Sequence, residues 1–487
     1  MLRFDPVNNN NYTTQKVSRG IQMAANRFFT GILPLALLLG GCNVADNSAE
    51  PNKPFAFLKK LESSNSDTTA QVSEENTKSL AEILNNGNSS LDMKNGFAKA
   101  IASAVIADPL IISAKEDLAA QRSQVEVAQS AKDIQFNATA LGGVEDVSDD
   151  ISGVALVLNA TRVISDGGKI DSRVASEKFA AEGAKYRLQA TMNERALSAV
   201  YAWVDLDRYE KLNDMIGSRL LILNPLIEQL ETVAAAGMGD ASQVAAAQRT
   251  VSQIRFTQTD IKERLEQSRV AFRSVFGTLP SGTKFDGSFI ESKLPTKVTK
   301  SIALSAPALL AAYASYNVAE ANLSGVQAKS KFDLGFETKV TKPFGGSDYS
   351  SDESIGLVLR KAFFNSKQLE AEEKAAKSRV DSAIAQIQST YREGEKTINT
   401  AQQTVKSMDE AIALARETAK VTRDEISYLR KQLIIGGSTL DSVLSAEARL
   451  YDAESKEIHF EADKVKAQVT VLSALGLLSQ SFGLSAE

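Results

Sequence analysis

The amino-acid sequence predicts an α+β membrane protein in which one unit of long coiled-coil helices and short strand pairs occurs twice. The first observation is that matching landmarks of the two halves lie 198 to 200 residues apart. These landmarks are Pro109 with Pro307, Gly237 with Gly437, and Gly277 with Gly476. A repeat of this size is too long for a solenoid and indicates two halves of one architecture. The other two observations are a long seven-residue apolar repeat and pairs of alternating segments.

The seven-residue repeat predicts one very long helix in the second half. Apolar residues recur in alternate steps of four and three from Val380 to Leu433, and only Gly394 and Thr422 depart from the pattern. A repeat of this kind keeps one helix face against a partner when the helices supercoil. No proline follows Pro343. The helix can therefore run over residues 366–435, about 100 Å at 1.5 Å per residue.

A return helix follows each long helix. In the second half it begins after Gly436 and Gly437, where Ser438 or Thr439 can cap it, and it continues to about Leu478. The first half repeats the arrangement with helices over 170–236 and 240–276. Pro225 is expected to kink the first of these, because a proline inside a helix removes a backbone hydrogen bond.

Segments in which apolar and polar residues alternate precede each long helix, and this alternation predicts strands. Apolar side chains share one face in four segments: Ile134, Phe136, Ala138 and Ala140; Val154, Leu156 and Leu158; Phe332, Leu334, Phe336, Thr338 and Val340; Ile355, Leu357 and Leu359. Strands of about 10 residues with one apolar face suit a membrane barrel, although a soluble sheet gives the same alternation. Four strands cannot close a barrel, since the smallest membrane barrels have about 8, so several chains must contribute.

The composition excludes several classes of protein. A net charge of −5 argues against nucleic-acid binding, and no apolar run reaches the roughly 18 residues of a spanning helix. His459 and Cys42 are the only histidine and cysteine, so a His/Cys metal site and an intrachain disulfide are excluded, and no cofactor is expected. His459 lies in a charged helical stretch, which favours a solvated face over a catalytic role, and the sequence indicates no enzyme.

The N-terminus is typical of a targeting segment. Residues 1–41 predict a signal peptide whose apolar core, Phe28 to Leu39, precedes Gly40, Gly41 and Cys42. This pattern resembles a bacterial lipoprotein signal and marks Cys42 as the lipidation site, although an ordinary secretory signal with a chance cysteine is the alternative. Met23 begins a more typical signal and is a candidate for the true start. Residues 42–92 are polar and predict a flexible tether.

Several local patterns together resemble the TolC-like outer-membrane efflux protein family, from about Gly96 to Leu478. Asp108-Pro109-Leu110 and Ala306-Pro307-Ala308 are similar to the family's entries into the first helix of each half. Residues 162–169, which read RVISDGGK, resemble its strand-to-helix junction "PLFDGGK", without the proline and with Ser165 for the aromatic. Residues 199–203 and 436–450 resemble its "AYLDL" and "DVLDAERxL" segments.

The resemblance implies a homotrimer in which three chains share one β-barrel in the outer membrane and one α-helical barrel in the periplasm. It implies two further partners, a periplasmic adaptor protein and an inner-membrane transporter. The expected function is the exit duct of a tripartite efflux or type I secretion system. The alternative is a structural periplasmic coiled-coil lipoprotein without a channel. The cargo, small toxic molecules or secreted protein, stays open.

Two groups of site residues follow from the resemblance. The expected adaptor-contact tips are Gly237, Met238, Gly239, Gly436, Gly437 and Ser438, although glycines also simply terminate helices. The candidate entrance-lining residues are Asp424, Asp441, Ser442 and Ser445. Ser442 and Ser445 stand where the family has aspartates, so the acidity of the entrance rests on Asp424, Glu425 and Asp441, which would favour cations. Solvated helix charge is the plainer interpretation of these carboxylates.

The expected organisation divides the chain into six segments. They are the signal peptide (1–41), the lipid-anchored tether (42–92), the first repeat (93–280), an inter-repeat linker (281–300), the second repeat (301–479) and a C-terminal tail (480–487).

Overall fold

The computed structural model describes residues 96–486 except 144–152, 237–240, 345–349 and 362–365. These residues belong to one compact unit, Glu75–Glu487. The predicted signal peptide, Cys42 and the predicted tether lie outside the described residues.

The elements follow each other in the same order twice. The first series is α3 (Phe97–Ala107), α4 (Pro109–Ser130), β1 (Gln135–Gly143), β2 (Gly153–Ser165), α5 (Lys169–Ala235) and α6 (Ala241–Phe276). Two short helices follow, α7 (Gly287–Lys293) and α8 (Lys300–Leu304). The second series is α9 (Pro307–Ala328), β3 (Asp333–Phe344), β4 (Asp352–Arg360), α10 (Ser366–Ile434), α11 (Leu440–Ala474) and α12 (Leu477–Ser481).

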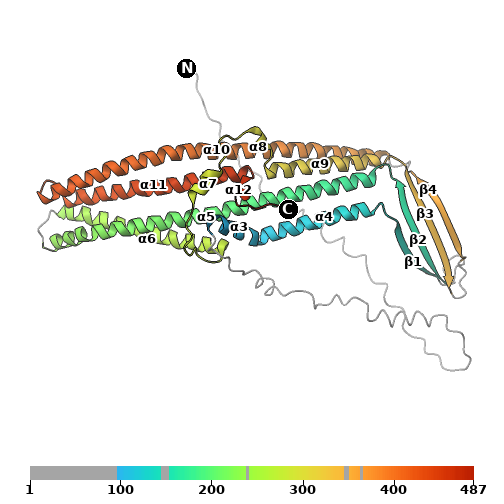
Figure 1. Ribbon diagram of the computed structural model, residues 1–487, viewed down its shortest axis with the longest axis horizontal. Coiled ribbons are helices and arrows are strands. Elements are labelled where there is room, and N and C mark those ends of the chain that lie inside the picture. Colours follow the sequence, from blue (N-terminus) through green and yellow to red (C-terminus); the bar gives the residue numbers. More distant parts are fainter. Residues whose placement is uncertain (1–95, 144–152, 237–240, 345–349, 362–365, 487) are drawn as a thin grey trace, which may run out of the picture. The chain divides into compact units, whose positions relative to one another are not determined.

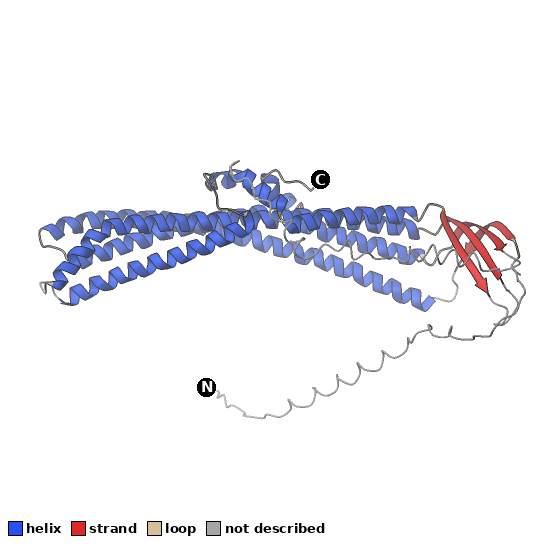
Figure 2. Cartoon of the chain, turned by 90° about the horizontal axis from the view of Figure 1, so that it is seen from below, coloured by secondary structure: helices blue, strands red, loops and turns tan. Residues whose placement is uncertain are grey.

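The long helices connect two different ends of this unit. In Figures 1 and 2 the sheet lies at one end of the helices, and the last residues of α5 and α10 and the first residues of α6 and α11 lie at the other. With 67 and 69 residues, α5 and α10 each extend for about 100 Å. We call α5 with α6 the first hairpin and α10 with α11 the second hairpin.

The predicted seven-residue repeat forms the buried face of α10. Eight of its positions are buried: Val380, Ile398, Ala401, Ile412, Ala415, Ala419, Thr422 and Ile426. Thr422 departs from the apolar pattern, but its hydroxyl donates to the Thr418 carbonyl at 2.7 Å, which satisfies the polar group inside the helix. Towards the turn between α10 and α11, Ala419 and Ile426 pack with Ala446, Leu450 and Ala453 of α11. Small residues on both helices allow the close approach that a coiled coil needs.

The strands form one antiparallel sheet in the order β1-β2-β3-β4, so β1 and β4 are its edges. Paired residues of an antiparallel sheet share a face. The register pairs Phe136 with Ala160, Leu158 with both Ala138 and Val340, and Phe336 with Leu357, which joins the predicted apolar sets into one face. This face is exposed: Phe136 is 81% and Ile355 75% accessible. The opposite face carries Asn137, Asn159, Lys339 and Ser354.

A glycine turn joins the sheet to α5. Gly167 and Gly168 have φ of 70° and 99°, and a Cβ on Gly167 would lie 2.5 Å from Cβ of Lys331. The Asp166 carboxylate accepts hydrogen bonds from the amides of Gly168 and Ile170, which caps the helix. Lys169 then pairs with Asp333 of β3 at 2.6 Å. The junction therefore ties the start of α5 to the neighbouring repeat.

An aromatic cluster forms the core halfway along the helices. Phe97, Trp203, Phe272 and Phe276 meet edge to face or stacked, with ring centroids 4.3 to 5.3 Å apart. Phe285, Phe289 and Phe482 from the linker and the C-terminal segment complete it. Aromatic pairs in such geometry add stability beyond their buried area.

The return helix of the second half ends earlier than predicted. α11 stops at Ala474, and Gly476, with φ of 75°, separates it from α12. A Cβ on Gly476 would lie 2.1 Å from Cδ of Pro307, so the close packing of α9 requires glycine here. Ser479 of α12 donates its amide to the Asn193 side chain at 3.0 Å, which fixes α12 on α5.

Among the described residues no single helix is long and apolar enough to cross a membrane. Only the bent pair α3 and α4, at 57° to each other, satisfies length and composition when taken together.

We predict that Phe272→Ala lowers the free energy of unfolding by about 3–5 kcal/mol, because the side chain is fully buried among aromatic rings. Trp203, the only tryptophan, contacts Phe272, so its fluorescence can follow urea unfolding directly. Ser274→Ala on the exposed face of α6 is the matched control and should leave the midpoint nearly unchanged. Equal midpoints for both variants would contradict the assignment of the core.

Candidate functional site at the helix tips

The tip of the second hairpin is a glycine turn held by backbone contacts. Gly436 has φ of 76°, a conformation that favours glycine, and the Gly437 amide donates to the Gln432 carbonyl at 2.9 Å. The Ser438 hydroxyl donates to the Leu429 carbonyl at 2.8 Å. Thr439, and not Ser438, caps α11: its hydroxyl accepts from the Ser442 amide at 3.2 Å. Gly237, Met238 and Gly239 of the first tip lie outside the described residues.

The candidate entrance residues differ in their exposure to solvent. Asp424 is exposed on α10, whereas Asp441, Ser442 and Ser445 are half-buried in the first turns of α11. Asp441 lies where a helix N-terminus favours a carboxylate, so it has a local structural role as well. Neither aspartate forms an ion pair with the described residues.

The buried Glu447 of α11 connects both hairpins near this tip. Its side chain is only 2% exposed and accepts from Arg219 of α5 at 2.6 Å and from Arg430 of α10 at 2.7 Å. Arg219 is 12% exposed and also donates to Glu454 at 2.5 Å, one heptad further along α11. We call Arg219, Arg430, Glu447 and Glu454 the arginine clasp. Removing one partner of such a buried pair leaves a charge uncompensated.

Further ion pairs join α10 to α11 along the second hairpin. Among the described residues they are Arg416 with Glu457 and Glu461, Arg423 with Glu454, Arg449 with Glu425, and Lys464 with Asp409, at 2.6 to 2.8 Å. Their arginine and lysine side chains are more exposed than Arg219, so each of these pairs contributes modestly to the stability of the hairpin. On the other side, Arg208 and Asp205 of α5 pair with Asp463 and Lys466 of α11. The helix α11 is thus bound by α10 and by α5.

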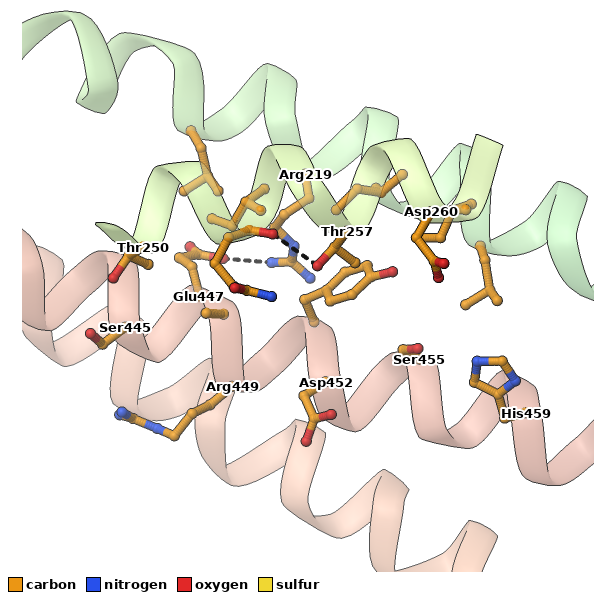
Figure 3. Close-up of a pocket in the computed structure, with 18 of the residues that line it drawn as sticks. Arg219, Thr250, Thr257, Asp260, Ser445, Glu447, Arg449, Asp452, Ser455 and His459 are labelled. Atoms are coloured by element: carbon orange, nitrogen blue, oxygen red, sulfur yellow. Dashed lines mark hydrogen bonds and ion pairs between the residues drawn. The ribbon is translucent and has the colours of Figure 1, made fainter. Parts of the chain in front are cut away.

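A cavity of about 810 Å³ lies beside the arginine clasp. Figure 3 shows Thr250, Thr257 and Asp260 of α6 on one side and Ser445, Asp452 and His459 of α11 on the other. Leu212, Ile216, Leu223 and Ile254 supply apolar walls. Burial raises the pKa of Tyr451 in this cavity to about 12, so its hydroxyl stays protonated at neutral pH. The cavity lies between the first hairpin and α11, next to the apolar cluster in which Leu444 of α11 packs with Leu212, Ile216 and Leu223 of α5.

The prediction of a solvated His459 is wrong. The imidazole is half-buried in the cavity and meets the Tyr209 ring edge to face, with centroids 6.5 Å apart. Burial lowers the pKa of His459 below its ordinary value, and nearby Arg208 and Arg264 lower it further, whereas Asp463 opposes them. The charged residues around His459 did not indicate this burial, because its neighbours Tyr209 and Arg208 lie on another helix, α5.

The arrangement suits a structural element that holds helices together. Within the described ranges no group of three or more histidine, cysteine or acidic side chains can hold a metal ion.

The arginine clasp was not predicted from the sequence, although one signal for it was present. Glu447 and Glu454 are seven residues apart, on the α11 face where Leu440, Val443, Leu444 and Leu450 predict an apolar seam. Acidic residues at seam positions indicate a buried partner.

Comparison with known proteins identifies the fold. The structure of CusC, a transmembrane channel protein, superposes with a TM-score of 0.69 at 14% identity, over 78% of this chain and 91% of that one. The outer membrane protein VceC of Vibrio cholerae superposes with a TM-score of 0.66 at 17% identity, over 78% of this chain and 96% of that one. The CmeC outer membrane channel of Campylobacter jejuni superposes with a TM-score of 0.68 at 14% identity, over 90% of this chain and 94% of that one. The fold is therefore that of the TolC-like channels, as the sequence motifs predicted.

The sequence carries the same relationship in its second half. Residues 298–477 match the family described as outer membrane efflux protein. No curated protein matches the chain. The family and the superposed structures are channels and not enzymes, which agrees with the class expected from the sequence.

We predict that Glu447→Gln lowers the free energy of unfolding by about 3 kcal/mol, because Arg219 and Arg430 lose the charge of their shared partner. Glu425→Gln is the matched control, since this carboxylate pairs with Arg449 in an exposed position and should contribute less than about 1 kcal/mol. Chemical denaturation followed by circular dichroism measures both. A loss at Glu447 no larger than that at Glu425 would contradict the clasp.

We predict that the pKa of His459 lies below its ordinary value of about 6.5. As pH falls, the unfolded chain then binds the proton first, so the histidine's contribution to stability is complete above about pH 6.5 and decreases below it. Because the chain has a single histidine, its imidazole NMR signal reports this pKa without assignment. His459→Gln should reduce the acid loss of stability, and a pKa at or above the ordinary value would refute the prediction.

Proposed function

We propose that three copies of this chain form an outer-membrane channel, the exit duct that receives cargo from an inner-membrane transporter through a periplasmic adaptor. The observation that carries the proposal is the four-stranded sheet. Within the part of the chain that the structure describes, it has one exposed apolar face, one polar face and two unpaired edges. A sheet surface of this kind is stable in lipid only when copies pair edge to edge and close a barrel.

Exposed apolar residues on the second hairpin support contacts between copies. Leu414, Val421, Tyr428 and Ile435 recur every seven residues and are 58 to 80% exposed. An uncovered stripe with this repeat fits another helix. On α6, Phe256 and Val270 are 70% and 63% exposed and lie two heptads apart. We infer that α10 of one copy packs on α6 of the next, which makes a ring of helices below the barrel.

The tips are the proposed adaptor contact. Ile434 and Ile435 are 86% and 80% exposed at the second tip, next to Gly436 and Gly437. Paired apolar side chains at a bare turn suit burial against another protein. The first tip, with Gly237, Met238 and Gly239, is proposed by its matching position. Cys42 is proposed as the lipid anchor in the same membrane.

Two cargo classes fit such a duct: small toxic molecules, or secreted protein. A photoactivatable crosslinker in place of Gly437 in cells should capture the adaptor, and a pump-type or secretion-type adaptor assigns the class of cargo. Capture of neither type would contradict the adaptor contact at this tip.

We predict that the purified wild-type protein gives discrete single-channel currents with a preference for cations in planar lipid bilayers. Asp441→Asn should reduce that preference, because a carboxylate at a narrow entrance attracts cations. Asp381→Asn, an exposed residue of α10 far from the tip, is the control and should change little.

Unchanged selectivity in Asp441→Asn would show that Asp441 does not line the entrance. Absence of any current from the wild type would favour the structural coiled-coil lipoprotein instead of a channel.

A further inference from the structure

We propose that the apolar face of the sheet binds anionic phospholipid headgroups through Arg162 of β2 and Lys361, the residue directly after β4. This rests on the proposed channel, because the face meets lipid only in a closed barrel. Three features of the described residues support it: a cation repeated in both halves, the place of both cations on the apolar face, and the lack of a carboxylate for Arg162 on that face.

The apolar face carries the same pattern in both halves of the chain. Alternate residues of β2 lie on it, and their counterparts on and after β4 follow 199 positions later, as in 361 − 162 = 199. The matching pairs are Leu156 with Ile355, Leu158 with Leu357, Ala160 with Leu359, and Arg162 with Lys361. Each apolar row therefore ends in a cation on the side of the long helices. In a barrel of three chains these positions would form a ring of six cations.

The register and one ring contact place both cations on this face. Arg162 is opposite Phe336 of β3, which in turn is opposite Leu357 of β4, and paired residues share a face. The Lys361 Nζ lies 4.4 Å from the centre of the Phe332 ring, which is itself 49% exposed. Aromatic side chains form girdles where a membrane barrel meets the headgroups. Lys361 over Phe332 is therefore at the level expected for headgroups.

The described residues offer Arg162 no carboxylate on the apolar face. Its side chain is exposed and forms no ion pair within the described part of the chain. The acidic residues of the neighbouring strand, Asp333 and Glu337, alternate to the opposite face and pair with Lys169 and Arg360. A charge that leaves water is costly unless an opposite charge meets it. On a face covered by lipid, that opposite charge has to come from the lipid.

The far end of the same face is neutral. Lys342 of β3 and Glu353 of β4 form an ion pair there at 3.0 Å. Both lie on the apolar face, because Lys342 is opposite Leu156 and Glu353 is opposite Val340. The excess positive charge of this face is thus confined to its helix end. In the proposed orientation the helices extend into the periplasm, so the cations meet the lipid leaflet on that side.

A phosphodiester group fits these two side chains. The planar guanidinium of Arg162 can donate two parallel hydrogen bonds to phosphate oxygens, and Lys361 supplies a point charge. Their long apolar stems can lie along the sheet while the charged groups reach the headgroups. Strand β3 separates the two cations, so each can hold its own lipid. A zwitterionic headgroup carries its own cation beside the phosphate, which favours lipids with a net negative charge.

Native mass spectrometry of the full-length protein in detergent tests the site. Phosphatidylglycerol and phosphatidylcholine with identical acyl chains are added separately, and the lipids retained by each assembly are counted. We expect phosphatidylglycerol to bind about fivefold more tightly per cation, the usual attraction between one basic residue and an anionic lipid surface. Its binding should saturate at two lipids per chain.

Arg162→Gln together with Lys361→Gln should abolish this preference. Arg162→Lys keeps the charge and should retain most of it. The matched control is Lys342→Gln with Glu353→Gln, which removes two charges from the other end of the same face and should leave the preference unchanged. Trp203 fluorescence and the mass of the assembly verify that each variant is folded.

Equal retention of the two lipids by the wild type, or a preference that survives in the double glutamine variant, would overturn the lipid site. Displacement of phosphatidylglycerol by an equal concentration of inorganic phosphate would indicate a free-anion site and would overturn it as well. Channel currents without any lipid preference would reject the lipid site alone. Absence of current from the wild type would reject the channel instead.

Discussion

The unpaired edges and the bare apolar face of the sheet are the constraint on which the remaining architecture depends. Among the described residues of one chain, strands β1 and β4 each leave one row of backbone groups without partners. Within one chain the sheet determines where α5 begins, because Asp166 caps α5 directly at the end of β2 and Lys169 binds Asp333 of β3. In the proposed assembly a ring of strands leads into a ring of long helices, with the glycine turn after α10 at the far end.

Helix α11 connects the two hairpins along their length. It packs on α10 through small residues such as Ala446 and Ala453 and pairs with α5 through Arg219. The buried Glu447 satisfies an arginine from each side, so the two hairpins cannot separate at this level without leaving a buried charge unpaired. Beyond it, the chain carries no further ionic contact between the hairpins among the described residues. Beyond the clasp, Leu440 and Leu444 of α11 continue the contact through apolar packing on the first hairpin.

Features that depend on local periodicity could be predicted from the sequence. The seam of α10 and the alternation in the strands are repeated signals over many residues, and both lie where the pattern placed them. Features that depend on distant partners could not. Glu447 pairs with Arg219, which lies 228 residues away in sequence on α5, and the half-buried His459 meets Tyr209 of the same helix. Gly476 ends α11 early because Pro307 of α9 packs against it, a contact no local pattern contains. Asp441 and Ser442 lie at the tip as expected, and their role in the entrance stays a prediction.

The central claim is that one chain is an incomplete structure that copies of itself complete. Native mass spectrometry of the purified, detergent-solubilised protein tests this most directly, because it counts chains in the intact assembly. The account predicts a single dominant species of three chains. A protein that remains a stable, soluble single chain would contradict it, since the exposed faces of β4 and α10 would then have no partner to cover them.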